Sequence, residues 1–165
     1  MSSFTTIDGR HLRRKVRAIV LDPTFNILLI RPHGYAKDCW TLPGGGVEGG
    51  ETPTQAAERE LGEELGLRAA DFLGLTSLNI FSEFIYGPEY KASRSLDHDG
   101  QLAEMFLCEV RGGAEIRRQV EEISDFRWFE PADASTAIRI PAQKSIFLRC
   151  LKGLESSCSC RSAAS

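Results

Sequence analysis

The sequence has no excess of positive charge and no long apolar run. Its 165 residues include 20 Lys and Arg against 23 Asp and Glu, which leaves a net charge of −3. No basic stripe is evident, so we expect no nucleic-acid partner held through its phosphates. No stretch is long and apolar enough for a signal peptide or a membrane span. We therefore expect a cytoplasmic protein with no membrane partner, and a small phosphorylated ligand bridged by a metal is compatible with this charge.

Cysteines are too few and too irregularly spaced for a zinc centre or a disulfide framework. The five are Cys39, Cys108, Cys150, Cys158 and Cys160, and no two have the Cys-x-x-Cys spacing. Cys108 and Cys150 lie in apolar stretches and are expected to be small buried side chains. Hydrophobic residues make up 42% of the chain, which suits one domain with one core.

Apolar runs and turn residues predict a mixed α/β domain over residues 12–155. We expect strands at 16–21, 27–31, 40–42, 72–81, 102–110 and 125–129, the first two forming a hairpin. A helical turn at 131–136 and a final helix from Pro141 to about Gly153 should follow. We expect a weakly specified segment at 1–11 and a disordered tail at 156–165.

The segment 82–100 contains few aliphatic residues and several breakers, including Gly87, Pro88 and Gly100. About twenty residues without structure is long for a compact domain. Such a loop often serves as a lid or selects the substrate. A long hairpin is the alternative.

A glycine-rich loop leads into the best-defined helix. Residues 43–51 include five glycines, which allow positive φ and close backbone approach. Thr52 then reads as an N-cap, with Pro53 at the first helical position and Gln55 completing a capping box. Gly66 is the expected stop signal. We therefore predict a helix over residues 53–65.

Three carboxylates, Glu60, Glu63 and Glu64, lie within five residues on this helix. Like charges one turn apart destabilise a helix, and burial makes their repulsion worse. Oxygen ligands in a cleft suit hard cations such as Mg²⁺ or Mn²⁺. Arg59 can reach Glu63 one turn on, or hold Glu51 across the loop. A solvent-exposed acidic face is the alternative reading.

The stretch from Gly45 to Leu67 resembles a complete Nudix box, whose pattern positions are Gly45, Glu51 and Arg59 to Leu67. The preceding residues, Trp40 to Gly46, resemble the segment that usually leads into that box. This resemblance implies a Nudix-type α/β/α sandwich with a mixed β-sheet between helices. It also implies a Mg²⁺- or Mn²⁺-dependent hydrolase of a nucleoside diphosphate linked to another group. Its proposed roles are metal ligation by Glu60, Glu63, Glu64 and the Gly44 carbonyl, and a structural ion pair between Arg59 and Glu51.

The general base varies within the family, so several acids are open candidates here. Glu60 and Glu63 are the candidates inside the box, and Glu121 or Glu122 is the candidate outside it. Glu104 is a possible extra ligand. Side chains that are candidates for contacting the substrate are Arg31, His33, Arg94 and His98 for phosphate and Tyr35, Phe84 and Tyr86 for a base. Plain surface exposure is the alternative for each.

The resemblance leaves the substrate open among nucleoside triphosphates, nucleotide sugars, ADP-ribose and dinucleoside polyphosphates. Two other classes share the fold: an isopentenyl-diphosphate isomerase, which uses a cysteine and a glutamate, and a nucleotide sensor with a degenerate box. Cys39 lies in a poor context for the isomerase, and no acidic box position is lost here. A hydrolase is therefore the leading hypothesis, with a homodimer possible as in many relatives.

Overall fold

A mixed sheet forms the centre of the computed structural model, which describes residues 1–163, with side chains for residues 1–156. The strands are β1 (Phe4–Ile7), β2 (Arg10–Leu21), β3 (Ile27–Pro32), β4 (Gly44–Gly46), β5 (Phe72–Ile85), β6 (Gly100–Val110) and β7 (Ile123–Phe129). Their main order is β5-β6-β2-β3-β7, and β1 and β4 both pair with β2. Only the β2–β6 pairing is parallel among these strands.

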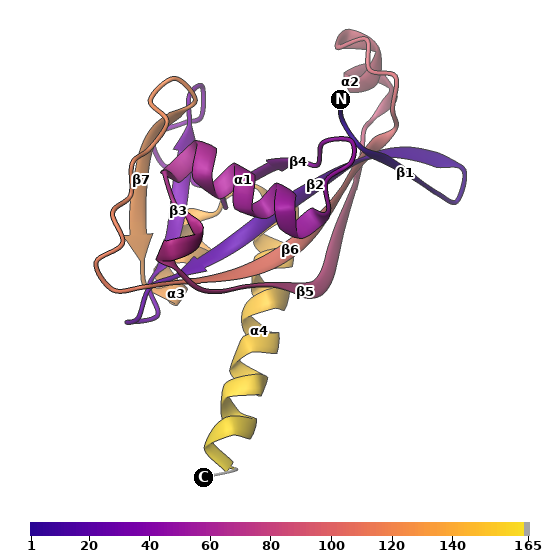
Figure 1. The fold of residues 1–165 in the computed structure, drawn as a ribbon. Coiled ribbons are helices and arrows are strands. Elements are labelled where there is room, and N and C mark those ends of the chain that lie inside the picture. Colours follow the sequence, from indigo (N-terminus) through magenta and orange to yellow (C-terminus); the bar gives the residue numbers. More distant parts are fainter. Residues whose placement is uncertain (164–165) are drawn as a thin grey trace.

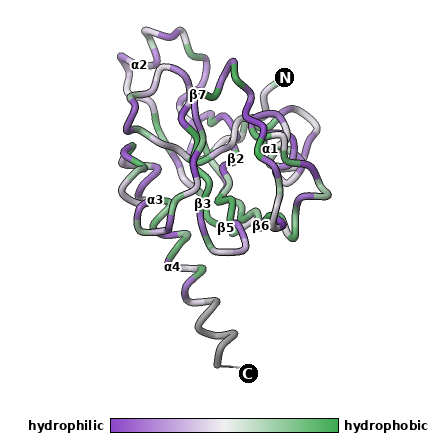
Figure 2. Tube along the Cα trace, turned by 90° about the vertical axis from the view of Figure 1, so that its left-hand side faces the viewer, coloured by the Kyte–Doolittle hydropathy of each residue, from purple (hydrophilic) through white to green (hydrophobic). Residues whose placement is uncertain are grey.

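Helices cover both faces of this sheet. They are α1 (Pro53–Leu65), α2 (Pro88–Ser93), α3 (Pro131–Ala137) and α4 (Pro141–Ala163), with a 3₁₀ turn at Ala69–Asp71. Figure 1 shows α1 in front of the sheet and α4 behind it. In Figure 2 the hydrophobic strands lie between α1 on one side and α3 and α4 on the other. Each face has its own buried cluster, so the predicted α/β/α sandwich is confirmed.

The helix predicted at residues 53–65 forms with the predicted ends. Thr52 Oγ1 accepts from the Gln55 amide, and the Gln55 side chain accepts from the Thr52 amide, which completes the capping box. Gly66 has φ 68°, in the left-handed region where glycine is favoured. Leu61 and Leu65 are buried against the sheet. This face anchors the helix and leaves its carboxylates facing the glycine loop.

The predicted hairpin between the first two core strands is open rather than paired along its length. β2 and β3 pair only at Leu21 and Ile27. The chain before β4 enters the gap, where Ile30 and Thr41 exchange two backbone hydrogen bonds of 2.9 Å and β2 donates to the Pro43 carbonyl. β4 then continues this insertion along β2. This insertion between β2 and β3 places the glycine loop in the middle of the sheet.

Three predicted segments differ in the structure. Within residues 1–11, β1 pairs with β2 through a turn whose Asp8 and Gly9 have φ 49° and 76°, so this segment is ordered as a hairpin. The loop predicted at 82–100 is a strand end, the helix α2 and the start of β6, which makes the hairpin alternative the better description. α4 does not end at Gly153 but continues to Ala163, through most of the tail expected to be disordered.

Several packing predictions hold. Cys108 and Cys150 are buried free thiols, and Trp40 is 5% exposed in the core. Cys158 and Cys160 lie outside the residues whose side chains are described. Within the described chain, no helix is long and apolar enough to cross a membrane.

Candidate active site

Two carboxylates of α1 lie against the glycine strand β4. The Gly44 amide donates a 3.0 Å hydrogen bond to Glu64 Oε2. A Cβ on Gly45 would stand 2.3 Å from Cδ of Glu60, so the Glu60 carboxylate fills the space that any larger residue would occupy. Glycine at these positions therefore lets α1 bring both carboxylates onto the backbone of the sheet.

Arg59 connects the helix to the loop. Its guanidinium donates to Glu51 at 2.6 and 3.2 Å and to the Gly46 carbonyl at 2.8 Å. The same group donates to Glu60 at 3.0 Å and to Glu63 at 3.2 Å. Both contacts considered from the sequence, to Glu51 and to Glu63, are therefore present. The bidentate geometry holds the loop at a set distance from the helix.

Burial distinguishes the three acids. Glu64 is 8% exposed and the Glu60 side chain 14%, whereas the Glu63 side chain is 60% exposed. Burial raises the pKa of Glu64 to about 7, and the charge of Glu60 adds to this rise. Burial also raises the pKa of Glu60, against the opposing effect of Arg59. For both carboxylates, burial therefore outweighs the nearby positive charges of Arg59, Lys15 and Arg17, which favour the ionised forms.

Glu64 should make the metal-free protein less stable as pH rises. Because its pKa in the folded protein is about 7 rather than the usual 4.5, the folded state keeps a proton that the unfolded chain has lost. The stability contributed by this proton is complete below pH 4.5 and is lost by about pH 7. We expect Glu64→Gln to flatten this decline, measured by urea unfolding in EDTA across that range.

Glu58→Gln is the matched control, since Glu58 lies exposed on the same helix. It should keep the pH dependence of the original protein. Added Mg²⁺ should stabilise the original protein more at pH 7.5 than at pH 5, because only the ionised carboxylate is a ligand. An identical pH profile for Glu64→Gln and the original protein would contradict this prediction.

The donor set has the chemistry of a hard-cation site, with carboxylate oxygens alone. Among the described residues, however, no group of three or more His, Cys, Asp or Glu side chains is gathered closely enough to hold a metal ion. Arg59 Nη1 donates to both Glu60 and Glu63, and the Gly44 amide occupies one oxygen of Glu64. The predicted ligand roles of Glu60, Glu63, Glu64 and the Gly44 carbonyl stay predictions.

An aromatic cavity of about 370 Å³ lies on the opposite face of the sheet from α1. All three aromatic residues predicted to stack on a base, Tyr35, Phe84 and Tyr86, line it. Tyr90 of α2 joins them, with its ring centroid 5.2 Å from that of Tyr86. Segments far apart in the sequence thus form one concave surface lined by aromatic side chains. Ligand-binding cavities commonly have such a lining.

Lys15 and Arg17 also line this cavity, and both interact electrostatically with the carboxylates of Glu60 and Glu64. Burial lowers the pKa of Lys15 to about 8, while the charges of Glu60 and Glu64 oppose that shift. Sequence reasoning missed both basic residues. The signal was present as basic residues alternating with others at 13, 15 and 17, which places them on one strand face. The expectation that the chain has no basic stripe therefore does not hold for this one strand face.

The basic residues predicted to bind phosphate do not line this cavity. Arg31 donates to Ser124 and the Lys37 carbonyl and lies 3.7 Å from Asp125. His33 Nε2 is 2.8 Å from the Val120 carbonyl. Arg94 stacks over Tyr90, whose ring centroid is 4.8 Å away. Each of the three side chains thus has a local contact, and its role in phosphate binding stays a prediction.

His98 is buried and supports the cavity from behind. Its Nε2 lies 3.4 Å from Tyr86 Oη, and its Nδ1 lies 3.0 Å from Asp97. Gln101 Nε2 donates to the same Tyr86 hydroxyl at 2.7 Å. His98 therefore contacts the Tyr86 side of the cavity wall, and a role in phosphate binding stays a prediction.

The candidate acids outside the box differ in position. Glu121 and Glu122 are both exposed, and the charge of Glu122 raises the pKa of Glu64, which places it near the site. Glu104 is half-buried in β6, opposite Val16 of β2, and lines a third cavity together with Arg14 and Lys15. Of the three, only Glu122 contributes to the raised pKa of Glu64, as a small effect after burial and the charge of Glu60.

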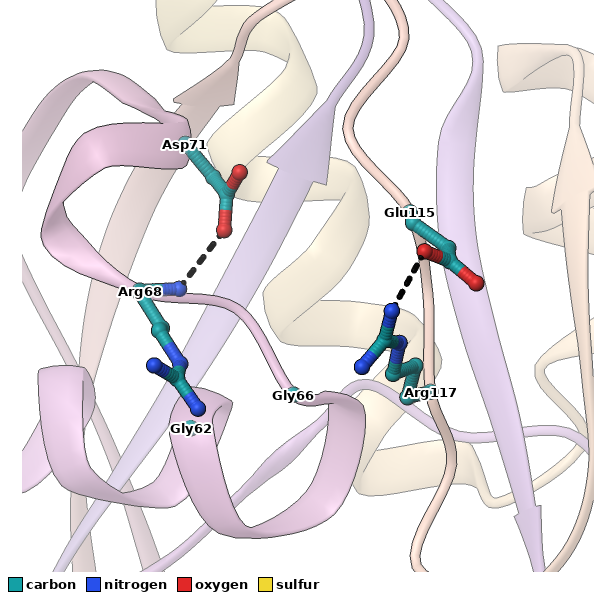
Figure 3. A pocket seen from close by; sticks show the side chains of 6 residues that line it. All are labelled: Gly62, Gly66, Arg68, Asp71, Glu115 and Arg117. Carbon is teal, nitrogen blue, oxygen red and sulfur yellow. Dashed lines mark hydrogen bonds and ion pairs between the residues drawn. The ribbon is translucent and has the colours of Figure 1, made fainter.

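A second cavity, of about 430 Å³, lies at the C-terminal end of α1 (Figure 3). Its charged side chains are engaged locally: Arg117 pairs with Glu115 at 2.8 Å, and Asp71 accepts from the Arg68 amide at 2.9 Å. None of the predicted site residues lines it. We therefore place the candidate site at the carboxylates and the aromatic cavity.

Comparison with known proteins identifies the family of this chain. Residues 11–150 match the family described as the NUDIX domain. An RNA pyrophosphohydrolase of Aeromonas hydrophila is 33% identical over 128 residues, which cover 74% of this chain and 72% of that protein. An RNA pyrophosphohydrolase of Sulfurovum sp. is 34% identical over 91 residues, 55% of this chain; the chain spans only 56% of that relative's length.

The fold agrees as well. The structure of E. coli dihydroneopterin triphosphate pyrophosphohydrolase superposes with a TM-score of 0.69, covering 82% of this chain and 92% of that one at 18% identity. Because the family match covers most of the sequence and includes the glycine loop and α1, this chain belongs to the Nudix hydrolase family.

Proposed function

We propose that this chain is a metal-dependent pyrophosphohydrolase that cleaves a phosphoanhydride bond of a nucleotide derivative by attack of water on phosphorus. The observation that carries the proposal is the pair of buried carboxylates, Glu60 and Glu64, held on β4, with a basic and aromatic cavity on the other face of the same sheet. Relatives named RNA pyrophosphohydrolase support the reaction type.

The residues of this chain would position the metal and the substrate, and none of them would attack phosphorus as a nucleophile. When bound, Mg²⁺ or Mn²⁺ would screen the substrate's charge, lower the pKa of the attacking water and stabilise the leaving phosphate. Glu60, Glu63 and Glu64 would hold it, with Glu63 released from its bond to Arg59. The Arg59–Glu51 pair keeps the loop and helix at the spacing this requires. No nucleophilic side chain is needed for phosphoryl transfer.

Glu122 is the candidate general base that the electrostatics favour. The Gln119 amide, three residues before it, donates to the Glu64 carbonyl at 2.9 Å, and the charge of Glu122 makes a small contribution to the raised pKa of Glu64. The backbone of Glu122 is fixed by hydrogen bonds from its amide to Gln119 and from the His33 amide to its carbonyl. The other acids named from the sequence, Glu121 and Glu104, lack such a link to the box.

The experiment that tests the proposal measures products from a panel of phosphoanhydrides. The panel contains nucleoside triphosphates, ADP-ribose, a nucleotide sugar, a dinucleoside tetraphosphate and an RNA with a 5′-triphosphate, each with Mg²⁺ or Mn²⁺. The last substrate is included because an RNA carries phosphoanhydride bonds only in such a terminal group. Reaction in ¹⁸O-water should label a phosphate product. Binding without turnover of any compound would instead indicate a sensor.

The aromatic cavity gives a separate prediction for binding. Tyr86→Leu removes a ring that lies between Phe84 and Tyr90 and whose hydroxyl is held by Gln101. Because base stacking on an aromatic side chain contributes about 1–3 kcal/mol, we expect KM to rise roughly tenfold or more with little change in kcat. Phe25→Leu, at an exposed turn, is the control and should leave KM unchanged. An unaltered KM for Tyr86→Leu would remove the cavity from substrate binding.

A further inference from the structure

Three basic side chains follow one another on a single face of β2, beside the glycine strand. Arg13, Lys15 and Arg17 are spaced two residues apart, so their side chains leave the same side of the strand. The Cα atoms of the outer two are roughly 13 Å apart at strand spacing. Lys15 and Arg17 pair in register with glycines of β4 and line the aromatic cavity. We call these three residues the β2 basic row.

The β2 basic row has no acidic partner of its own. Among the described residues, none of the three forms an ion pair within 4.0 Å. Arg17 donates only to a neutral acceptor, the Leu42 carbonyl, at 3.0 Å. Nε of Arg13 is the one buried side-chain polar atom without a hydrogen-bond partner in the part of the chain that the structure describes. Because buried donors normally have partners, Nε of Arg13 is available to an acceptor such as an anion.

The glycines of β4 leave room for the side chains on both sides of this strand. A Cβ on Gly46 would stand 2.6 Å from Nη2 of Arg13, so glycine there leaves room for the guanidinium. Gly45 leaves room in the same way for Glu60. The glycine backbone of β4 thus lies between the β2 basic row on one side and the Glu60 carboxylate on the other. Burial is the main cause of the lowered pKa of Lys15, and the charges of Arg17 and Arg13 add to it against the opposing charges of Glu60 and Glu64.

We infer that the β2 basic row binds a chain of three or more phosphate groups, which deepens the proposed function and rests on it. The row is longer than a single diphosphate linkage and carries one more positive charge than such a linkage can match. A terminal triphosphate or a longer phosphate bridge supplies both the length and the charge. The substrate class is therefore a nucleoside polyphosphate or a 5′-triphosphorylated chain, in preference to ADP-ribose or a nucleotide sugar.

The first test is binding without catalysis. Calorimetry in EDTA should show that the original protein binds inorganic tripolyphosphate more tightly than pyrophosphate. Arg13→Met and Lys15→Met should each weaken tripolyphosphate binding by about tenfold or more, the loss expected for one hydrogen bond to a charged group. Arg14→Met is the matched control, because Arg14 is the neighbouring residue on the opposite face of β2, and it should leave binding unchanged.

The second test compares kcat/KM for GTP, a 5′-triphosphorylated RNA and ADP-ribose. Turnover of either triphosphate at least tenfold above ADP-ribose supports the inference, and the better of the two identifies the source of the phosphate chain. Equal use of ADP-ribose, or equal affinity for pyrophosphate and tripolyphosphate, overturns it. An equal loss of binding in Arg14→Met also overturns it. Absence of all turnover refutes the proposed function, while tripolyphosphate binding still decides the role of the row.

Discussion

Glu64→Gln is expected to lower kcat by roughly 10²–10³-fold or more while the protein stays folded. Glu64 is the most buried of the box carboxylates and accepts a hydrogen bond from the Gly44 amide. Glutamine keeps the shape and the acceptor but removes the charge that would neutralise a bound cation. Loss of one group that stabilises transition-state charge has effects of this size. Steady-state phosphate release with saturating Mg²⁺ is the measurement.

Glu58→Gln again provides the control, with the same change on the exposed side of α1. It should keep full activity. Circular dichroism and a melting curve of Glu64→Gln should match the original protein near neutral pH, apart from the pH effect described above. If Glu64→Gln retains full activity, Glu64 has no part in catalysis and the assignment of the metal site is wrong.

Gly45→Ala should inactivate the enzyme without unfolding it. The new methyl group would stand 2.3 Å from Cδ of Glu60, so one of the two must move. The movable partner is the far end of the Glu60 side chain, whereas β4 is held by its pairing with β2. A displacement of about 1 Å in a positioned catalytic group can cost roughly 10²-fold in rate. We expect kcat to fall by that order with a change of a few degrees at most in Tm.

Gly112→Ala is the matched control for this change. A Cβ at Gly112 would lie 3.6 Å from Pro23, which is an ordinary contact, so this variant should retain both activity and stability. Normal kcat in Gly45→Ala would show that the position of Glu60 beside β4 has no role in the reaction. A large loss of stability without loss of specific activity would give β4 a purely structural role.

Local signals were sufficient for the helix and its ends. The N-cap at Thr52, the stop at Gly66 and the apolar stripe through Leu61 act within a few residues of one another, so their effect does not depend on distant contacts. The same holds for the ion pair between Arg59 and Glu51, whose partners are eight residues apart. By contrast, Gly153 did not end α4, since a helix tolerates an interior glycine at a cost of about 1 kcal/mol.

The segment 82–100 shows the opposite case. Its residues carry weak local preferences, and the end of β5 forms because it pairs with β6, for example Phe84 with Gln101. Strand propensity depends strongly on such neighbours. Only this pairing brings Phe84 and Tyr86 to the cavity wall, although both residues were singled out from the sequence as aromatic candidates.

The sequence by itself determined the glycine loop, the capped helix and the spacing of Glu60, Glu63 and Glu64, because each depends on residues close together in the chain. Only the tertiary structure decided which carboxylates are buried and which basic residues face the cavity. That decision comes from β2, which pairs with the distant strands β4 and β6 and so brings Lys15 and Arg17 beside the glycine loop. Such pairings depend on burial across the whole sheet, which no short stretch of sequence specifies.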